Sequence, residues 1–155
     1  MLDITPSEAY LFADEIASNL IALEKRRARR NTRSMSKPTI LIVDDQHLVA
    51  DTTKEVLNRS GFKAVCAYNG RSALEIAAKL RPDYLLSDVL MPGMNGVELA
   101  IAIQKELPET RIVLFSGQAG ITDIVSKAKA DGHTFDLLAK PIHPEKLLEH
   151  LKQKA

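Results

Sequence analysis

The chain has little of what several classes of protein require. It contains one cysteine, Cys66, among 155 residues, which excludes an intramolecular disulfide and a zinc site built from several cysteines. We expect this thiol to pack in a protein of the reducing cytosol. An excess of one charge sign is also missing, because 21 Lys and Arg residues face 20 Asp and Glu residues. The net charge of +1 gives no overall reason to expect nucleic acid or an acidic membrane as a partner.

Long hydrophobic runs are absent as well. The apolar stretch at residues 10–23 contains Asp14 and Glu15 and is followed by basic residues, which is the wrong order for a secretory signal. No window reaches the length of a membrane span, so we expect a cytoplasmic protein with no membrane partner. Hydrophobic residues make up 45% of the chain and charged residues 26%, the proportions of a globular protein with a core.

The composition changes near residue 37. The run KRRARRNTRSMSK, from Lys25 to Lys37, holds seven basic residues and no acidic one, which is typical of a linker. We therefore expect an N-terminal amphipathic helix and basic linker at residues 1–37 and a globular domain at residues 38–155. An alternative start of translation is Met35, since MSKPTILIVDD is how the globular domain alone would begin.

The first 30 residues predict one helix. Thr5-Pro6-Ser7-Glu8 is a typical helix start, and the basic residues at 26–30 favour the negative C-terminal end of a helix dipole. Apolar residues recur between them at spacings of three and four, at Ala9, Phe12, Ala13, Ile16, Leu20 and Leu23. This stripe must be covered by a second copy of the chain, by another partner or by the rest of the chain.

The remainder alternates strand and helix patterns five times. Apolar, β-branched runs predict strands at Thr39–Val43, Lys63–Ala67, Asp83–Ser87, Arg111–Phe115 and Thr134–Leu138. Helical patterns follow them near residues 47–60, 70–80, 96–106, 120–130 and 144–153. Such alternation indicates an α/β fold with a doubly wound parallel sheet and helices on both faces.

Charged and polar residues stand where four of these strands end. They are Asp44 and Asp45 after the first strand, Asp88 after the third, Ser116 after the fourth and Lys140 after the fifth. The carboxyl ends of parallel strands share one edge of the sheet, where such folds bind ligands. Three neighbouring carboxylates require a compensating charge, and Mg²⁺ prefers oxygen ligands of this kind. The set predicts a site that binds a phosphoryl group.

These residues lie in motifs that resemble the response-regulator receiver family of two-component signalling. The motifs are ILIVDD at 40–45, LLSDVLMPGMNG at 85–96, VLFSG at 113–117 and AKPI at 139–142. Their order along the chain is far more specific than any one of them. The resemblance covers residues 38–153 and implies a flavodoxin-like sheet of five strands in the order 2-1-3-4-5.

The resemblance implies a role for each carboxylate. Asp88 corresponds to the phosphoacceptor, which attacks the phosphorus of a phosphohistidine and becomes an acyl phosphate. Asp45 and Asp88 resemble the direct Mg²⁺ ligands, Asp44 the carboxylate that reaches the ion through water, and Leu90 the donor of a backbone carbonyl.

It also implies partners for the phosphoryl oxygens. Ser116 corresponds to the switch hydroxyl and Lys140 to the lysine that pairs with a phosphoryl oxygen. Pro141 follows, and in the family the Lys-Pro bond is typically cis.

Four positions concern the aromatic switch and the rate of dephosphorylation. The aromatic switch residue expected three positions before the lysine is replaced by Leu137, which leaves Phe135 as the candidate for that role. Leu90 and Gln118 occupy the two positions that tune dephosphorylation. Since leucine cannot orient an attacking water, we expect slower phosphoryl hydrolysis than in fast chemotaxis-type receivers.

We expect a single-domain response regulator that signals by protein contact, not an enzyme or a direct DNA-binding protein. The expected partners are a histidine kinase or phosphotransfer protein, a downstream protein and, through the N-terminal stripe, a second copy. Residues near 121–130 and 145–151 correspond to the family's output face.

Two other classes of function compete with this interpretation. A haloacid-dehalogenase-type phosphohydrolase needs Asp-x-Asp after its first strand and a cap, but Asp44 is followed by Asp45 and Gln46 and no insertion is long enough. A receiver-like adaptor that never takes phosphate is disfavoured because every expected site residue is present. The four histidines show no metal-binding spacing and predict surface or packing roles.

Overall fold

The computed structural model describes residues 17–26, 36–117, 121–133, 135–140 and 143–153. The chain divides into two compact units, Met1–Lys37 and Pro38–Ala155, and each is described by itself. In the first unit, residues 17–26 form a helix, as the sequence predicts. The remainder of the helix predicted over residues 6–30, with its start at Thr5–Glu8, lies outside the described residues. No helix within the described ranges combines the length and apolar character needed to cross a membrane.

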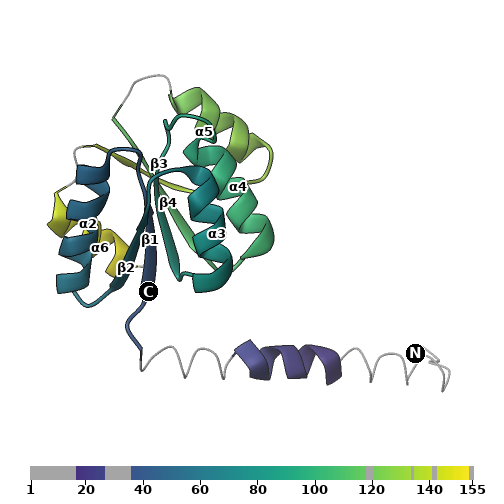
Figure 1. The fold of residues 1–155 in the computed structure, drawn as a ribbon. Helices are drawn as coiled ribbons and strands as arrows, with labels where there is room; N and C mark the ends of the chain where they lie inside the picture. Colours follow the sequence, from purple (N-terminus) through teal and green to yellow (C-terminus); the bar gives the residue numbers. More distant parts are fainter. Residues whose placement is uncertain (1–16, 27–35, 118–120, 134, 141–142, 154–155) are drawn as a thin grey trace, which may run out of the picture. The chain divides into compact units, whose positions relative to one another are not determined.

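The second unit is a three-layered α/β domain (Figure 1). Its strands are β1 (Thr39–Val43), β2 (Lys63–Ala67), β3 (Tyr84–Asp88), β4 (Arg111–Ser116) and β5 (Asp136–Ala139). Its helices are α2 (His47–Arg59), α3 (Gly70–Leu80), α4 (Gly96–Glu106), α5 (Ile121–Ala130) and α6 (Pro144–Gln153). The strands are parallel and form one sheet in the order β2-β1-β3-β4-β5. The predicted fold class and strand order are confirmed.

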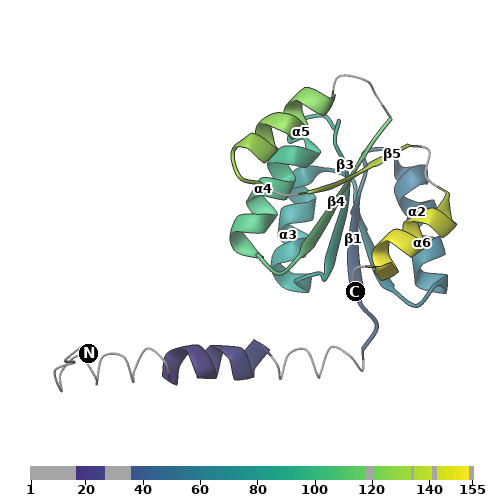
Figure 2. The ribbon, with the colours of Figure 1, turned by 180° about the vertical axis from the view of Figure 1, so that it is seen from behind.

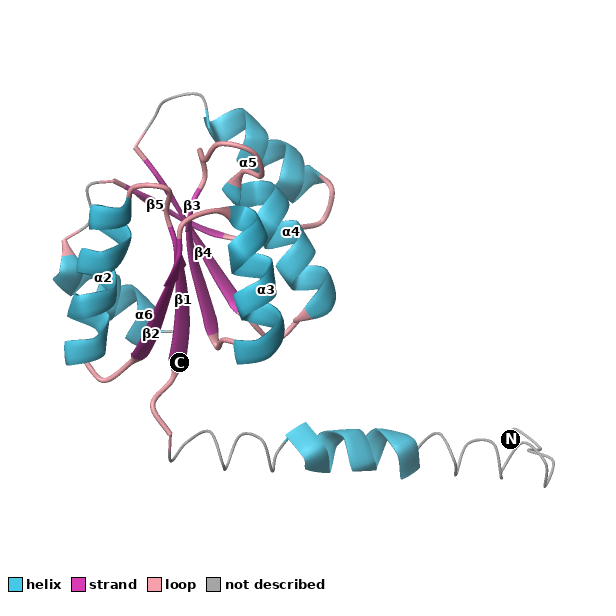
Figure 3. Cartoon of the chain, in the orientation of Figure 1, coloured by secondary structure: helices cyan, strands magenta, loops and turns pink. Residues whose placement is uncertain are grey.

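The helices cover both faces of the sheet. Helices α3, α4 and α5 lie on one face, while α2 and α6 lie on the other (Figures 2 and 3). Both faces need cover because both are hydrophobic, as the central strand β1 shows. Its side chains alternate between two hydrophobic clusters: Leu41 and Val43 belong to one, and Ile40 and Ile42 to the other. All four side chains are at most 3% exposed. Burying an aliphatic side chain of this size stabilises a fold by about 1.5–3 kcal/mol, so the central strand is a rigid support.

Three predicted strands had boundaries that were wrong by one or two residues. Strand β3 begins at Tyr84, where its register with both β1 and β4 begins. The carboxylate of the preceding Asp83 accepts hydrogen bonds from the backbone amide (2.9 Å) and hydroxyl (3.1 Å) of Thr39. Strand β4 extends to Ser116, which pairs with Ala139. Strand β5 spans 136–139 and not 134–138, since its register with β4 starts at Asp136. Pairing between strands, not local composition, sets these limits.

Candidate functional site

The predicted site residues meet at the carboxyl edge of the sheet. Asp44 and Asp45 follow β1, Asp88 ends β3, Ser116 ends β4 and Lys140 follows β5. The backbone amide of Lys140 donates a hydrogen bond of 2.9 Å to the carbonyl of Ser116, which places the lysine beside the end of β4. The parallel register therefore brings residues far apart in the sequence to one edge.

The three aspartates form a compact acidic cluster. One carboxylate oxygen from each of Asp44, Asp45 and Asp88 lies within 4.8 Å of the others. Among the described residues, no other group of histidine, cysteine, aspartate or glutamate ligands is gathered closely enough for a metal ion. Oxygen ligands about 2.1 Å from Mg²⁺ stand roughly 3 Å apart when adjacent and about 4.2 Å apart when opposite. Small side-chain movements would close the cluster on such an ion, so the donor set fits Mg²⁺.

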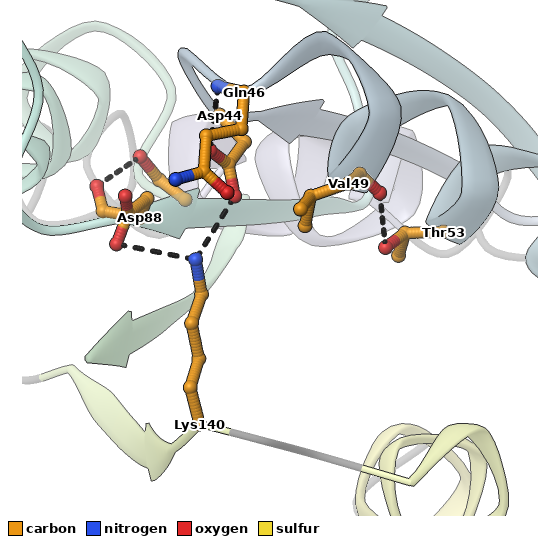
Figure 4. A network of polar contacts seen from close by, with 7 residues as sticks. Asp44, Gln46, Val49, Thr53, Asp88 and Lys140 are labelled. Carbon is orange, nitrogen blue, oxygen red and sulfur yellow. Dashed lines mark hydrogen bonds and ion pairs between the residues drawn. The ribbon is translucent and has the colours of Figure 1, made fainter. Parts of the chain in front are cut away.

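The Lys140 ammonium reaches between two of these carboxylates (Figure 4). Its Nζ lies 3.0 Å from Oδ2 of Asp44 and 3.5 Å from Oδ1 of Asp88. One ammonium offsets one of three negative charges when all three carboxylates are ionised. The remaining charge of the cluster matches that of a divalent cation.

Asp44 is held in a fixed orientation by its two carboxylate oxygens. Its Oδ1 accepts a hydrogen bond of 3.0 Å from the backbone amide of Gln46, while Oδ2 accepts from Lys140 (Figure 4). The residue is only 3% exposed, whereas Asp45 is exposed. Because both oxygens of Asp44 are engaged, Asp45 and Asp88 are better placed to give an oxygen to a metal ion.

Asp88 has a carboxyl group with a perturbed affinity for protons. Burial raises the pKa of Asp88, the Lys140 ammonium lowers it in part, and the nearby Asp44 carboxylate raises it further, so that it stays above its ordinary value. The charged form of this side chain is therefore disfavoured in the protein alone. A cation in the cluster would reverse that preference.

The backbone of Asp88 is held in place by Ser87 and Gly96, two residues that were not predicted to belong to the site. The hydroxyl of Ser87, which is fully buried, donates a hydrogen bond of 2.9 Å to the carbonyl of Asp88. A Cβ on Gly96 would meet that carbonyl oxygen at 2.1 Å, so only glycine lets α4 begin this close to the phosphoacceptor candidate. The Gly96 amide also donates to the carbonyl of Val89 at 2.8 Å.

A capping box fixes the same helix start. The side chain of Asn95 accepts from the amide of Glu98 at 2.8 Å, and the carboxylate of Glu98 accepts from the amide of Asn95 at 3.3 Å. The sequence signal for this clamp is Asn95-Gly96 with glutamate two residues later. It marks a helix start, but it does not reveal how closely Gly96 approaches Asp88.

The residues expected to tune the switch lie in different environments. Leu90 and Leu137 are each 41% exposed. Phe135 is only 6% exposed and precedes β5, at the end of that strand opposite to Lys140. The aromatic ring therefore lies away from the edge that holds Ser116. Gln118 and Pro141 lie outside the described residues.

Three histidines make contacts that need no metal, in line with the expected packing roles. His47 stacks on Tyr68 with ring centroids 3.8 Å apart, His133 contacts Phe135, and a ring nitrogen of His150 lies 3.2 Å from Asp136. His143 is exposed.

The lone cysteine packs as expected. Its Sγ donates a hydrogen bond of 3.2 Å to the carbonyl of Ala50, and burial raises the pKa of Cys66.

The comparisons with known proteins agree on one family. Residues 40–152 match the family described as response regulator receiver domain. The chain is 34% identical over 119 residues to sporulation initiation phosphotransferase F of Bacillus subtilis, covering 77% of this chain and 94% of that protein. It is 30% identical over 115 residues to the chemotaxis protein CheY of Thermotoga maritima, covering 74% of this chain and 94% of that protein.

Solved structures show the same likeness. The chemotaxis protein CheY4 of Vibrio cholerae is 31% identical, with a TM-score of 0.69 over 76% of this chain and 98% of that one. A CheY-like receiver domain protein from Methanospirillum hungatei is 28% identical, with a TM-score of 0.70 over 77% of this chain and 94% of that one. By sequence comparison, the chain is also 36% identical over 121 residues to the nitrate/nitrite response regulator protein NarL of Escherichia coli, and this match covers 76% of this chain but 54% of that protein.

Proposed function

This chain belongs to the response regulator receiver domain family, and on that premise we propose that it is a switch that accepts a phosphoryl group on Asp88. The donor is a phosphohistidine on a histidine kinase or phosphotransfer protein. The observation that carries the proposal is the acidic cluster of Asp44, Asp45 and Asp88, into which Lys140 reaches.

The transfer uses a carboxylate oxygen of Asp88 as nucleophile. This oxygen forms a bond to phosphorus while the bond between phosphorus and the donor imidazole nitrogen breaks, and the imidazole leaves with that electron pair. Asp45, Asp88 and the carbonyl of Leu90 would hold Mg²⁺, with Asp44 acting through water. When bound, this ion would offset the negative charge of the phosphoryl oxygens and of the cluster.

Lys140 and Ser116 have roles after transfer. Phosphorylation replaces the carboxylate that Lys140 contacts at 3.5 Å by a more highly charged group, so the ammonium is already positioned to pair with a phosphoryl oxygen. The hydroxyl of Ser116, at the end of the neighbouring strand, donates to another. These two contacts make the edge of β4 and β5 sensitive to phosphorylation.

Signalling then proceeds by protein contact. Helix α5 precedes β5 in the chain and α6 follows it. Leu137 of β5 is 41% exposed and Ile124 of α5 is 38% exposed. Exposed apolar side chains on the elements that follow the phosphoryl-sensitive end of β4 suit a downstream protein partner. We expect no turnover of an external substrate and no direct contact with DNA.

Phosphoryl hydrolysis is expected to be slow. The side chain of Leu90 cannot orient a water for attack on phosphorus, which removes one source of general acid-base assistance. Decay of the phosphorylated protein over minutes or longer is the expected result in a time course of intact mass. Decay within seconds would refute the role given to Leu90.

The test is phosphorylation by acetyl phosphate with Mg²⁺, read by intact mass. We expect one phosphoryl group on the wild-type chain and none on Asp88→Asn. The matched control is Asp131→Asn, which changes an exposed carboxylate far along the sequence and should be modified like the wild type. A wild-type protein that stays unmodified would overturn the proposal and favour a receiver-like adaptor. Modification that persists in Asp88→Asn would also overturn it.

A further inference from the structure

Strand β4 ends with Phe115 and Ser116, so an aromatic side chain directly precedes the candidate switch hydroxyl. Phe115 is the one aromatic residue in β4 and β5, the two strands whose ends lie beside Ser116 and Lys140. Its backbone is in register with Asp88, and its carbonyl accepts a hydrogen bond of 3.0 Å from the amide of Val89. A movement of this strand end therefore includes Phe115.

The Phe115 ring packs on the face of the sheet that α2 and α6 cover. It packs against the hydrophobic cluster that contains Leu57 of α2 and Leu147 of α6. Successive side chains of a strand point to opposite faces, so this ring and the Ser116 side chain leave β4 on different sides. Phe115 therefore connects the carboxyl edge of the sheet with α2 and α6, and not with α5.

A cavity of about 300 Å³ lies between the sheet, α2 and α6. Its lining includes Phe115, Thr53 of α2 and Leu147 of α6, and it extends to Asp44 and Lys140 at the carboxyl edge. Figure 4 shows Thr53 on α2 and the Lys140 side chain reaching to Asp44. Phe115 is only half-buried, and a cavity of about 150 Å³ is enough to hold a benzene ring. The ring therefore has room to turn further inward.

We propose that Phe115 takes the role of the aromatic switch residue, by turning into this cavity when Asp88 is phosphorylated. The inference rests on the proposed transfer to Asp88. It assigns to β4 the role that Leu137 of β5 has no aromatic ring to fill and that Phe135 lies at the wrong end of β5 to fill. The change in packing then reaches α2 and α6.

Lys140 and Ser116 provide the driving force. Before transfer, Lys140 is held at the cavity by its contact of 3.0 Å with Asp44. A phosphoryl group draws the ammonium of Lys140 and the hydroxyl of Ser116 toward its oxygens. Both movements change the surroundings of Phe115, and burial of more of its ring stabilises the inward position.

The first test uses fluorescence. The chain contains no tryptophan, so Phe115→Trp introduces the only indole of the protein. This variant is treated with acetyl phosphate and Mg²⁺, and its phosphoryl content is read by intact mass in the same sample. We expect quenching of the indole by acrylamide to fall about twofold or more on phosphorylation, because the ring moves from a half-buried to a buried position. The same variant with Asp88→Asn should show no change.

Two matched variants place the indole on the β5 side of the site. Phe135→Trp makes the same substitution at the far end of β5, and Leu137→Trp makes it where the family pattern has its aromatic residue. Both should respond to phosphorylation less than Phe115→Trp does. A response at position 137 without one at position 115 would return the role to β5 and overturn the proposal.

The second test fills the cavity and leaves Phe115 in place, so it stands even if the tryptophan variant does not fold. Thr53→Leu adds a larger side chain to the cavity wall. Because coupling between two sites is reciprocal, blocking the inward ring should weaken binding of the phosphoryl mimic beryllofluoride, with Mg²⁺, about fivefold or more in a calorimetric titration. The control is Thr52→Leu, the same change at an exposed neighbour that does not line this cavity, and its dissociation constant should stay within about twofold of the wild type.

The outcomes separate this inference from the proposed switch. A Phe115→Trp chain that carries the phosphoryl group with unchanged or increased quenching would overturn the role of Phe115 and leave the switch intact. Equal affinities of Thr53→Leu and the wild type for beryllofluoride would overturn the role of the cavity. A wild-type chain that never takes the phosphoryl group would overturn both proposals.

Discussion

Replacing Asp88 by asparagine should stabilise the metal-free protein, although it removes the residue proposed to carry the phosphoryl group. Burial is the largest cause of the raised pKa of Asp88; the Lys140 ammonium, 3.5 Å away, opposes it, and the Asp44 carboxylate adds to it. One oxygen from each aspartate lies within 4.8 Å of the others, and at that separation two ionised carboxylates repel by about 3.5 kcal/mol at an effective dielectric constant of about 20. Asparagine removes both the cost of burying an ionised carboxylate and this repulsion, and it gives up the attraction to Lys140. We expect a net stabilisation on the order of 1–2 kcal/mol.

The pH dependence of this effect has a definite sign. Burial, opposed by Lys140 and reinforced by Asp44, raises the pKa of Asp88 in the folded protein above its value in the unfolded chain. The folded state therefore binds the proton more tightly, and the stabilisation that this provides is lost as pH rises through the raised pKa. The advantage of Asp88→Asn should appear as pH rises to neutral and disappear in acid.

Urea unfolding followed by circular dichroism, in EDTA, measures the difference. Addition of Mg²⁺ should stabilise the wild type by about 1.4 kcal/mol at ten times the dissociation constant, and stabilise Asp88→Asn much less. Asp131→Asn is the control and should stay within about 0.5 kcal/mol of the wild type. A metal-free Asp88→Asn protein that is less stable than the wild type at neutral pH would refute this account of the cluster.

Three further predictions concern other parts of the domain. Gly96→Ala should lower the free energy of unfolding by about 3 kcal/mol, because the added Cβ would lie 2.1 Å from the carbonyl oxygen of Asp88. The control is Gly117→Ala, whose Cβ would have ordinary contacts and should lower it by less than about 1 kcal/mol in the same urea unfolding experiment. Arg81→Gly should raise stability by about 0.5–1 kcal/mol, since Arg81 ends α3 at a φ of 47°; an unchanged unfolding midpoint would contradict this. Cys66 should react with iodoacetamide several-fold more slowly in the folded protein than in urea, because burial raises its pKa, and equal rates would show that the thiol is freely accessible.

Local sequence determined most elements of the domain. The predicted limits of β1 and β2 are those of the structure, because both strands are apolar runs bounded by clear turn or linker residues. The helix start at Asn95 could likewise be read from its capping pattern. These features depend on interactions within a few residues, which the sequence displays directly.

The edge of the sheet that carries the site was also predictable. Strands joined by helices run parallel, so residues at their carboxyl ends must share one side. That rule alone predicts that Asp44, Asp88 and Lys140 lie close together, although they are distant along the chain.

Tertiary structure decided what the pattern could not show. Three features of the site depend on how separate elements pack. Lys140 bridges Asp44 and Asp88, and both carboxylate oxygens of Asp44 accept hydrogen bonds. Gly96 lies close to the backbone of Asp88. The position of Phe135 at the far end of β5 depends on strand register in the same way. Such contacts join residues distant in the sequence with a precision of about an ångström, and only the packed core sets distances on that scale.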